Sequence, residues 1–345
     1  MIKFIKYALL LIPVTLLCSC VGTAASAEEY YSIGMAYYDL GKFEEAEKWL
    51  NRASSANKTM VASEYNLGRI AFEAGRYRDA VKHFENILKR DPENVLALKA
   101  AAYSRIKTGD LVVAEKHYSR VLELVPESAD DGYNHALVLY AMERYSKAEE
   151  VMNKYPFALQ ENGELLLLYA RSQKAQNKVE AIDNYAKWLS SNSDAKARYE
   201  YAQLLQQHEF YARALEEYRQ ALSEVTGTED DLKKSDVRFS LARLLLIADG
   251  ESSEGVTELQ TAVGEGFNDV AKVDELRRNN RVSASNRDKL RNIVNDMQRS
   301  IEEKARIEAE AEKARLEAER ALAEESGLGE TQDGASESEP ESSTN

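Results

Sequence analysis

Small and apolar residues return along the chain at a constant step. Gly34 and Gly68 are 34 residues apart, and the same step joins Ala46 to Ala80 and Ala80 to Ala114. Three segments with this step begin with glycine, have alanine sixth and apolar residues third and tenth, and read GKFEEAEKWL (41–50), GRYRDAVKHF (75–84) and GDLVVAEKHY (109–118). Such a period predicts a stacked array of similar units, because one helix-turn-helix unit cannot bury its apolar face alone.

Each residue that recurs at a fixed position of the repeat has a physical role in a pair of antiparallel helices. A small residue at the eighth position, such as Gly68, and alanine at the twentieth, such as Ala80, let the two helix backbones approach closely. Glycine at the fifteenth position, such as Gly75, suits the left-handed residue that follows a helix. Pro92 and Pro126 favour the end of the second helix, because proline disfavours helical backbone in the residue before it.

In these residues the chain resembles the tetratricopeptide repeat (TPR) family, whose repeats are 34 residues long. The resemblance implies an all-α fold, a right-handed TPR superhelix of helix-turn-helix repeats, over residues 27–267. The first three of about seven repeats match the family pattern most fully, and the seventh matches it least. The expected repeats are 27–60, 61–94, 95–128, one that begins near Ala129, about 162–194, 195–228 and about 235–267.

Beyond the array, residues 268–298 are expected to form capping helices, because apolar residues continue there at helical spacing. Residues 299–325 are rich in Ala, Glu, Lys and Arg, a composition that charged helices and coiled coils share. Their apolar residues are too sparse for a sound coiled-coil seam, which favours a lone charged helix. Residues 326–345 contain five acidic and no basic residues, and we expect a disordered acidic tail.

The first residues read as an export signal. Lys3 and Lys6 precede an apolar run that is too short to span a bilayer, as in a secretory signal peptide. The sequence Leu-Cys-Ser-Cys that ends at Cys20 resembles the lipobox of bacterial lipoproteins. This resemblance implies a signal peptide at 1–19, acylation (palmitate among the acyl chains) of Cys20, and a membrane-proximal linker at 20–26. A soluble secreted form cleaved after Ala27 remains the alternative.

The composition of the chain limits the functions that it can have. The 59 Asp and Glu outnumber the 45 Lys and Arg in 345 residues, for a net charge of −14. This acidity argues against nucleic-acid binding, because phosphate neutralisation needs clustered basic residues. The only cysteines are Cys18 and Cys20, and no histidine pair, phosphate loop, nucleophile elbow or HExxH motif is present. We therefore expect a non-enzymatic protein with no catalytic residue, cofactor or metal.

The TPR resemblance also implies a binding surface. In that family, the first helix of each repeat lines a concave groove that holds a protein or peptide partner. The groove positions of this chain carry the aromatic, cationic and other residues Tyr31, Met35, Tyr38, Tyr65, Arg69, Phe72, Lys99, Tyr103, Lys107, Tyr133, Tyr140, Tyr199, Gln203, Phe239 and Arg243. Rings with a polar tip suit binding surfaces, although tyrosine also packs between helices. Tyr31 and Met35 replace the Lys and Asn of chaperone-binding TPRs, so a carboxylate clamp of that type is not expected.

Together these features predict a lipid-anchored TPR scaffold for protein–protein interaction in the bacterial cell envelope. The expected location is the periplasmic face of the outer membrane, with a role in outer-membrane protein or envelope complex assembly. Two alternatives remain open. One is an adaptor for cell-wall hydrolases or proteases. The other is a binding component for small hydrophobic ligands that partners a transport system.

Overall fold

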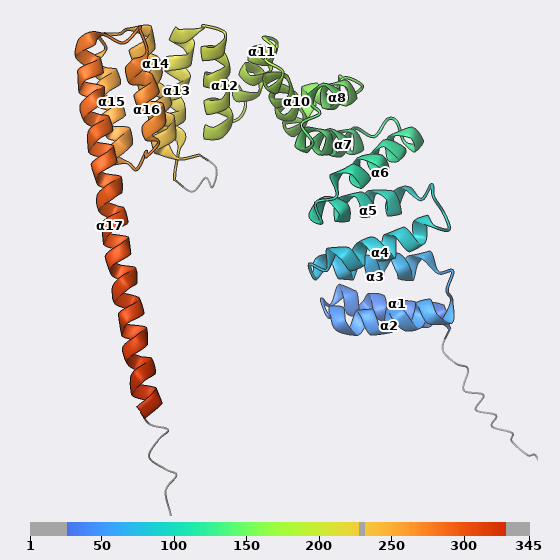
Figure 1. Ribbon diagram of the computed structural model, residues 1–345. Helices are drawn as coiled ribbons and strands as arrows, with labels where there is room; N and C mark the ends of the chain where they lie inside the picture. Colours follow the sequence, from blue (N-terminus) through green and yellow to red (C-terminus); the bar gives the residue numbers. More distant parts are fainter. Residues whose placement is uncertain (1–25, 228–231, 329–345) are drawn as a thin grey trace, which may run out of the picture. The chain divides into compact units, whose positions relative to one another are not determined.

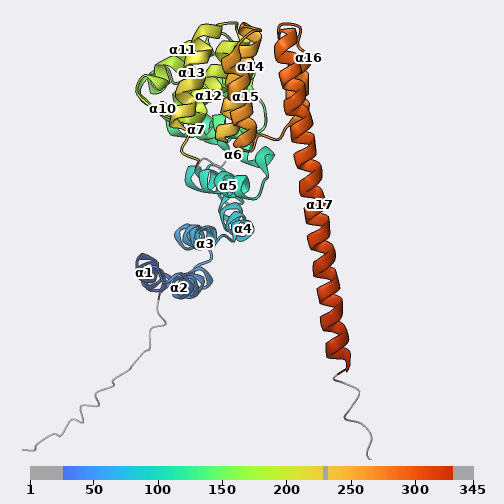
Figure 2. The same ribbon diagram turned by 90° about the vertical axis from the view of Figure 1, so that its left-hand side faces the viewer.

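The computed structural model describes residues 26–227 and 232–328, with side chains up to residue 322. These residues form 17 α-helices and no β-strand, which confirms the all-α prediction. The helices fall into two compact units, residues 1–165 and 166–345, and the boundary lies in the first turn of α10 (Gly163–Ala175). Within each unit, antiparallel hairpins of helices stack on one another (Figures 1 and 2).

The first unit is a stack of helical hairpins. Its helices are α1 (Ala27–Asp39), α2 (Phe43–Ala56), α3 (Val61–Glu73), α4 (Tyr77–Leu88), α5 (Val95–Lys107), α6 (Leu111–Leu124), α7 (Ala129–Ala141), α8 (Tyr145–Met152) and the single turn α9 (Ala158–Glu161). Its core is a series of small clusters, each shared by neighbouring hairpins. Ala46 and Leu50 of α2, for example, pack with Leu67 and Ile70 of α3. Each hairpin therefore depends on the next for burial.

Small residues hold the two helices of a hairpin close together, as predicted. Ala46, Ala80 and Ala114 have no exposed surface. A methyl group placed on Gly34 would lie 2.8 Å from the Leu50 side chain, closer than real Cβ contacts. Only glycine at this position of α1 leaves room for the Leu50 side chain of α2.

A left-handed residue ends the first helix of each of six successive repeats. Gly41, Gly75 and Gly109 have φ of 70°, 72° and 81°, which confirms the role predicted for glycine at this position. In the next three repeats the same positive φ is adopted by Glu143, Asn177 and Glu209. The turn geometry is thus retained where the sequence no longer marks it with glycine, and the change of residue explains why the repeat pattern fades there.

The last hairpin of the first unit is irregular. Helix α8 ends at Met152, and Tyr155 then turns back against Gly132, where an added methyl group would lie 2.2 Å from the ring. The Tyr155 hydroxyl donates a hydrogen bond of 2.9 Å to the Pro126 carbonyl. A bulky tyrosine outside the helix thus fills the space that a longer second helix would occupy.

The second unit contains α10 and seven further helices, which are α11 (Ala181–Leu189), α12 (Ala195–Gln207), α13 (Tyr211–Glu224), α14 (Lys234–Ala248), α15 (Ser253–Gly264), α16 (Val270–Arg278) and α17 (Ala284–Leu328). Two hydrophobic clusters form its core, one from α10 to α14 and one from α14 to α17. Arg198 of α12 is buried and bonds Glu217 and Glu224 of α13 at 2.9 Å each. This ion network fastens the two helices of the sixth expected repeat.

One long helix forms the end of the second unit. Helix α17 is continuous across the point where the capping segment 268–298 was expected to give way to the charged segment 299–325. Leu290, Ile293, Val294 and Met297 pack on the end of the unit, whereas every residue from 298 to 322 is exposed. One helix therefore spans both segments, and charge pairs four residues apart support it beyond residue 298.

Several predicted features fall outside the described residues. They are the signal peptide 1–19, Cys20, the linker up to residue 25 and residues 329–345 of the acidic tail. Within the described ranges, no helix combines the length and apolar character that a bilayer span requires.

Candidate functional site

The first helices of the first two repeats carry a hydrogen-bonded row of predicted groove residues. The Arg69 guanidinium donates to the Tyr38 hydroxyl at 2.8 Å and lies 4.7 Å from the centre of that ring. Arg69 also donates to the Asn66 amide oxygen at 3.1 Å, and the amide nitrogen of Asn66 donates to the Tyr31 hydroxyl at 3.1 Å. The row joins α1 to α3, and its members are half-buried except for the buried Asn66.

The row continues with aromatic contacts from the second repeat to the third. The rings of Phe72 in α3 and Tyr103 in α5 lie 5.2 Å apart. Lys107, one turn beyond Tyr103, places its ammonium 5.6 Å from the centre of the Tyr103 ring. Tyr103 is 47% exposed and Lys107 is also exposed, so these two are the accessible members of this part of the face. We call the row formed by Tyr31, Tyr38, Asn66, Arg69, Phe72, Tyr103 and Lys107 the inner face of the first unit.

Other predicted residues serve packing or internal pairing. Lys99 of α5 bonds the buried Asp131 of α7 at 2.5 Å, and so its charge is matched within the protein. Tyr65 packs on Phe84, with ring centres 5.5 Å apart, and Met35 packs against the cluster around Leu50. Tyr133 and Tyr140 of α7 are half-buried. These side chains stabilise the solenoid that supports the inner face.

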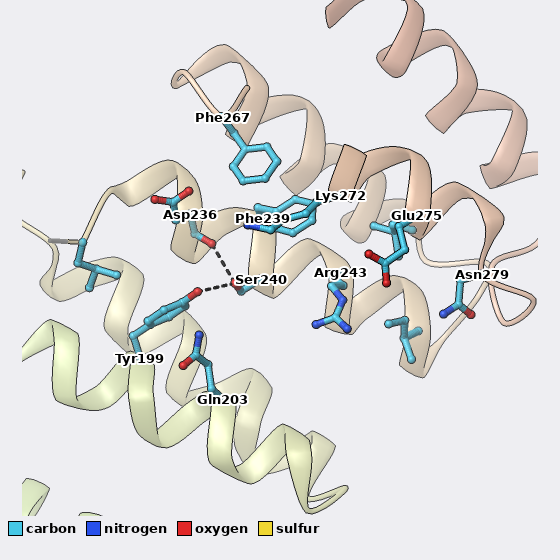
Figure 3. A pocket seen from close by; sticks show the side chains of 13 residues that line it. Tyr199, Gln203, Asp236, Phe239, Ser240, Arg243, Phe267, Lys272, Glu275 and Asn279 are labelled. Atoms are coloured by element: carbon cyan, nitrogen blue, oxygen red, sulfur yellow. Dashed lines mark hydrogen bonds between the residues drawn. The ribbon is translucent and has the colours of Figure 1, made fainter. Parts of the chain in front are cut away.

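The second unit contains a cavity of about 520 Å³ that is lined by α12, α14 and α16 and by the residues after α15. Figure 3 shows side chains from these elements converging on it. Phe239 and Phe267 stack at 4.2 Å with nearly parallel rings, and both are buried. We call this cavity the aromatic pocket; its apolar lining is Phe239, Phe267, Ile247, Leu276 and Leu232, and its polar lining includes Tyr199, Gln203, Arg243, Glu275 and Asn279.

A second cavity of about 500 Å³ shares Gln203, Ser240 and Arg243 with the aromatic pocket. Its remaining lining residues are Lys174, Gln206, Gln207 and Tyr218. The lining therefore has two cationic side chains and no carboxylate, in a protein whose net charge is −14. We call it the cationic pocket, and the two together the C-terminal cleft.

Hydrogen bonds fix the polar side chains of the cleft. Lys174 donates to the Gln203 amide oxygen at 2.9 Å, and the Tyr218 hydroxyl donates to the Gln206 amide oxygen at 2.9 Å. The hydroxyls of Tyr199 and Ser240 are 2.9 Å apart (Figure 3). Burial lowers the pKa of Lys174, since a desolvated ammonium is disfavoured; Glu200 opposes this shift and Arg171 adds to it. Burial also raises the pKa of Tyr218 and keeps its hydroxyl protonated.

The structure thus brings the predicted residues together in two groups. Tyr199, Gln203, Phe239 and Arg243 line the C-terminal cleft, and the predicted residues of the first two repeats, with Tyr103 and Lys107, form or support the inner face of the first unit. Sequence reasoning missed the contribution of α16, which closes the aromatic pocket with Leu276, and that of Lys174. The helical pattern of 268–298 predicted capping helices there, but no motif in that segment indicates that α16 lines a pocket.

Within the described residues, the arrangement provides surfaces that a partner could contact. In the part of the chain that the structure describes, no three His, Cys, Asp or Glu side chains are grouped so that they could hold a metal ion. His117 and His135 carry ring nitrogens that are buried and lack hydrogen-bond partners among the described residues. Burial lowers the pKa of both, and so they are neutral at pH 7.

Comparison with known proteins agrees with the repeat pattern and the fold. Two tetratricopeptide repeat models match the chain, one at residues 27–59 and one at residues 65–129. A TPR protein from Parabacteroides merdae has a similar structure, with a TM-score of 0.50 at 20% identity, over 72% of this chain and 96% of that one. Residues 27–59 and 65–129 thus match tetratricopeptide repeats, and the fold of the chain is that of a TPR solenoid.

Two curated relatives share parts of the sequence. A Treponema pallidum protein described as an "uncharacterized lipoprotein" is 24% identical over 153 residues, which cover 44% of this chain and 78% of that protein. The human protein O-mannosyl-transferase TMTC3 is 26% identical over 128 residues, 36% of this chain but only 14% of the transferase. TPR repeats imply a scaffold that binds protein or peptide partners and that is typically not an enzyme.

Proposed function

We propose that this chain is a lipid-anchored scaffold of the bacterial cell envelope that holds a protein partner against the inner helices of its TPR repeats. The acyl chains on Cys20 would fix it to the membrane, at the periplasmic face of the outer membrane. There it would serve the assembly of outer-membrane proteins or of another envelope complex. The repeats themselves carry no chemistry in this proposal; they position the partner.

One observation carries the proposal: the inner face of the first unit is a preformed, half-exposed row of aromatic and cationic side chains. The Arg69 hydrogen bond to Tyr38 and the Phe72 contact with Tyr103 hold these side chains in place before any partner binds. Prearranged aromatic and arginine side chains are the residues that dominate protein interfaces, because little rotamer freedom is lost when a partner docks. Tyr103 and Lys107 remain open for contact.

Membrane attachment is the second part of the proposal and has its own support. The lipobox-like sequence before Cys20 and the relationship to the Treponema lipoprotein both favour it. Several acyl chains on one residue would hold the protein far more firmly than a single chain. The Cys20→Ala variant is expected to leave the membrane fraction, whereas retention there would contradict the anchor.

Crosslinking in living cells tests partner binding. A photoreactive amino acid at position 103 is expected to capture one defined envelope protein, and the same group at Phe157, which is 80% exposed and precedes α9, serves as the control. An identical set of products from both positions would refute the inner face as a binding surface. If the captured protein is a cell-wall hydrolase or protease, the scaffold is an adaptor for that enzyme.

A second candidate function is supported by the aromatic pocket. Its stacked Phe239 and Phe267 and its volume of about 520 Å³ would suit one small hydrophobic ligand, as in a binding component of a transport system. Native mass spectrometry of protein purified from its own cells distinguishes the two. A bound small molecule of constant mass favours this candidate, and a chain free of small molecules that retains a protein partner favours the scaffold.

A further inference from the structure

We infer that the C-terminal cleft of the second unit binds an acidic peptide segment, with a carboxylate in the cationic pocket and a bulky apolar side chain in the aromatic pocket. This inference rests on the proposed scaffold function and names the partner chemistry of one part of the scaffold. The cleft is a separate site from the inner face of the first unit, with its own ligand and its own test.

The charge of the cationic pocket points to an anion. Lys174 and Arg243 line it without any carboxylate. Arg243 is exposed and has no ion-pair partner among the described residues, in contrast to Arg198 and Arg238 of the same unit, which each bond two glutamates. Lys174 is half-buried and its only hydrogen-bond partner in the described chain is the neutral amide of Gln203. A carboxylate between these two cations would receive charge-assisted hydrogen bonds.

The neighbouring aromatic pocket requires that the anion be attached to an apolar group. Arg243 and Phe239 are one turn apart on α14, so the cationic and apolar sites lie about 5–6 Å apart at their Cβ atoms. An extended chain advances about 3.3 Å per residue. The two ligand groups are therefore side chains of residues one or two positions apart. The aromatic pocket is lined by two carboxylates, Asp236 and Glu275, and by two cations, Arg243 and Lys272, whereas the cationic pocket has no carboxylate. The carboxylate of the peptide is therefore expected in the cationic pocket.

The polar lining favours a peptide over a fatty acid of similar charge. Gln203, Gln206 and Gln207 line the cationic pocket, and Tyr199, Ser240 and Asn279 add hydroxyl and amide groups in the aromatic pocket. Side chains that both donate and accept match the alternating N–H and C=O groups of an extended backbone. A fatty acid needs one anion site and a long apolar channel, whereas polar side chains line both pockets here.

The test uses the full chain and fluorescein-labelled hexapeptides with blocked ends, in which one Glu and one Phe stand adjacent or two apart in a Ser/Gly background. Fluorescence polarisation is expected to show saturable binding at micromolar to millimolar peptide. Replacing Glu by Gln or Phe by Ala in the peptide should weaken binding about tenfold or more, the size of one lost charge-assisted contact or one emptied pocket. Dodecanoate is titrated in parallel as the lipid arm.

Two protein variants and one control variant show whether the cations of the cleft bind the carboxylate of the peptide. Arg243→Gln and Lys174→Gln are each expected to weaken the Glu-containing peptide about tenfold and to leave the Gln-containing peptide unchanged. Arg219→Gln removes a cation of α13 that pairs with Glu254 outside the cleft, and it should bind like the wild type. Circular dichroism of all variants shows whether they are folded. If the Lys174→Gln variant does not fold, the Arg243→Gln variant alone tests the cationic pocket, because Arg243 is exposed and its replacement should not disturb the fold.

Any one of four results would overturn the inference: no saturable binding, equal binding of the Glu and Gln peptides, an unchanged affinity in Arg243→Gln, or tight dodecanoate binding that excludes all peptides. Failure here with successful crosslinking at position 103 leaves the proposed scaffold function intact. Binding that depends on Arg243, without any partner captured in cells, would instead support the cleft and refute the inner face.

Discussion

Gly68 of α3 lies directly against the ring of Phe84 in α4, so closely that a methyl group on Gly68 would stand 2.6 Å from a ring carbon. Phe84 is buried and cannot move aside freely. The Gly68→Ala variant should therefore overpack the hairpin and lose about 1–3 kcal/mol of stability, more than the gain of up to about 1 kcal/mol that alanine has over glycine inside a helix. Urea denaturation measures the change.

Gly264→Ala is the matched control for that variant. Gly264 ends α15 and has open space where its Cβ would lie, so alanine there should be neutral or slightly stabilising. Equal loss of stability in the two variants would show that close packing against Phe84 is not the cause.

Replacing Glu143 by glycine should stabilise the protein. Glu143 has φ of 58° at the turn between α7 and α8, and a residue with a Cβ is strained there by about 1–2 kcal/mol, against about 0.5–1 kcal/mol of extra chain entropy for glycine. The expected net gain is about 0.5–1 kcal/mol in the free energy of unfolding, measured by urea denaturation. Glu150→Gly, at an exposed helical position in α8, should instead destabilise by about as much. A loss of stability in Glu143→Gly would contradict the strain.

Acid should destabilise the first unit through His135. Burial lowers its pKa, Lys154 lowers it further, and Glu115, whose carboxylate oxygen lies 3.6 Å from Nε2, opposes both. The unfolded chain then binds the proton more readily than the folded one, so stability is full above about pH 6.5 and falls as pH decreases below it.

The measurement is the midpoint of urea denaturation between pH 5 and 8 for the wild type and His135→Leu. The variant should lose part of the slope below pH 6.5, and the remainder would come from His117, whose pKa burial also lowers. Parallel curves for the two proteins would show that His135 does not contribute.

Removing the Tyr103 ring should weaken partner capture. Its exposed ring stacks on Phe72 and receives Lys107, and a truncated interface aromatic of this kind typically costs more than about 1 kcal/mol, or about fivefold in affinity. The amount of partner recovered with Tyr103→Ala, compared with Phe157→Ala, measures the effect. Tyr65 and Phe72 are poorer choices because both also pack against the buried cluster that contains Phe84. Equal recovery with both alanine variants would place the binding surface elsewhere.

The regular part of this fold could be predicted because its signals are local. Gly41, Gly75 and Gly109 mark turns that only one residue type adopts easily, and the alanine series marks contacts that admit only small side chains. The prediction weakens where a different residue accepts the same geometry. Asn177 and Glu209 occupy the left-handed position, and Tyr155 replaces part of a helix.

The candidate sites depend on contacts that repeat position alone does not specify. The predicted groove positions Tyr199 and Arg243 line the aromatic pocket, but the cavity exists because Phe267 and Leu276 also line it. In the same way, repeat position selected Lys99 without revealing that Asp131, one repeat away, neutralises it. Whether a charge is available to a partner is decided by neighbours distant in sequence.

The charge pairs within α17 are predicted to stabilise the exposed part of this helix. Arg306 bonds Glu303 and Glu310, and Arg315 bonds Glu312 and Glu319, all along one exposed helix. Each pair stabilises the helix by about 0.2–0.5 kcal/mol. Hydrogen exchange of residues 299–322 should therefore be faster in a double variant, Arg306→Glu with Arg315→Glu, and in 1 M salt. Unchanged exchange would indicate that intrinsic helix propensity alone maintains this segment.

From Met297, the last buried residue of α17 among the side chains described up to residue 322, the helix runs on to Leu328, which at about 1.5 Å per residue is roughly 45 Å. A random coil of that many residues would fold back and sample short separations, whereas a stiff rod excludes them. Anything joined to the far tip is thus held away from the base of α17 in the second unit, and a tilt of that base by a few degrees becomes a displacement of several ångströms at the tip.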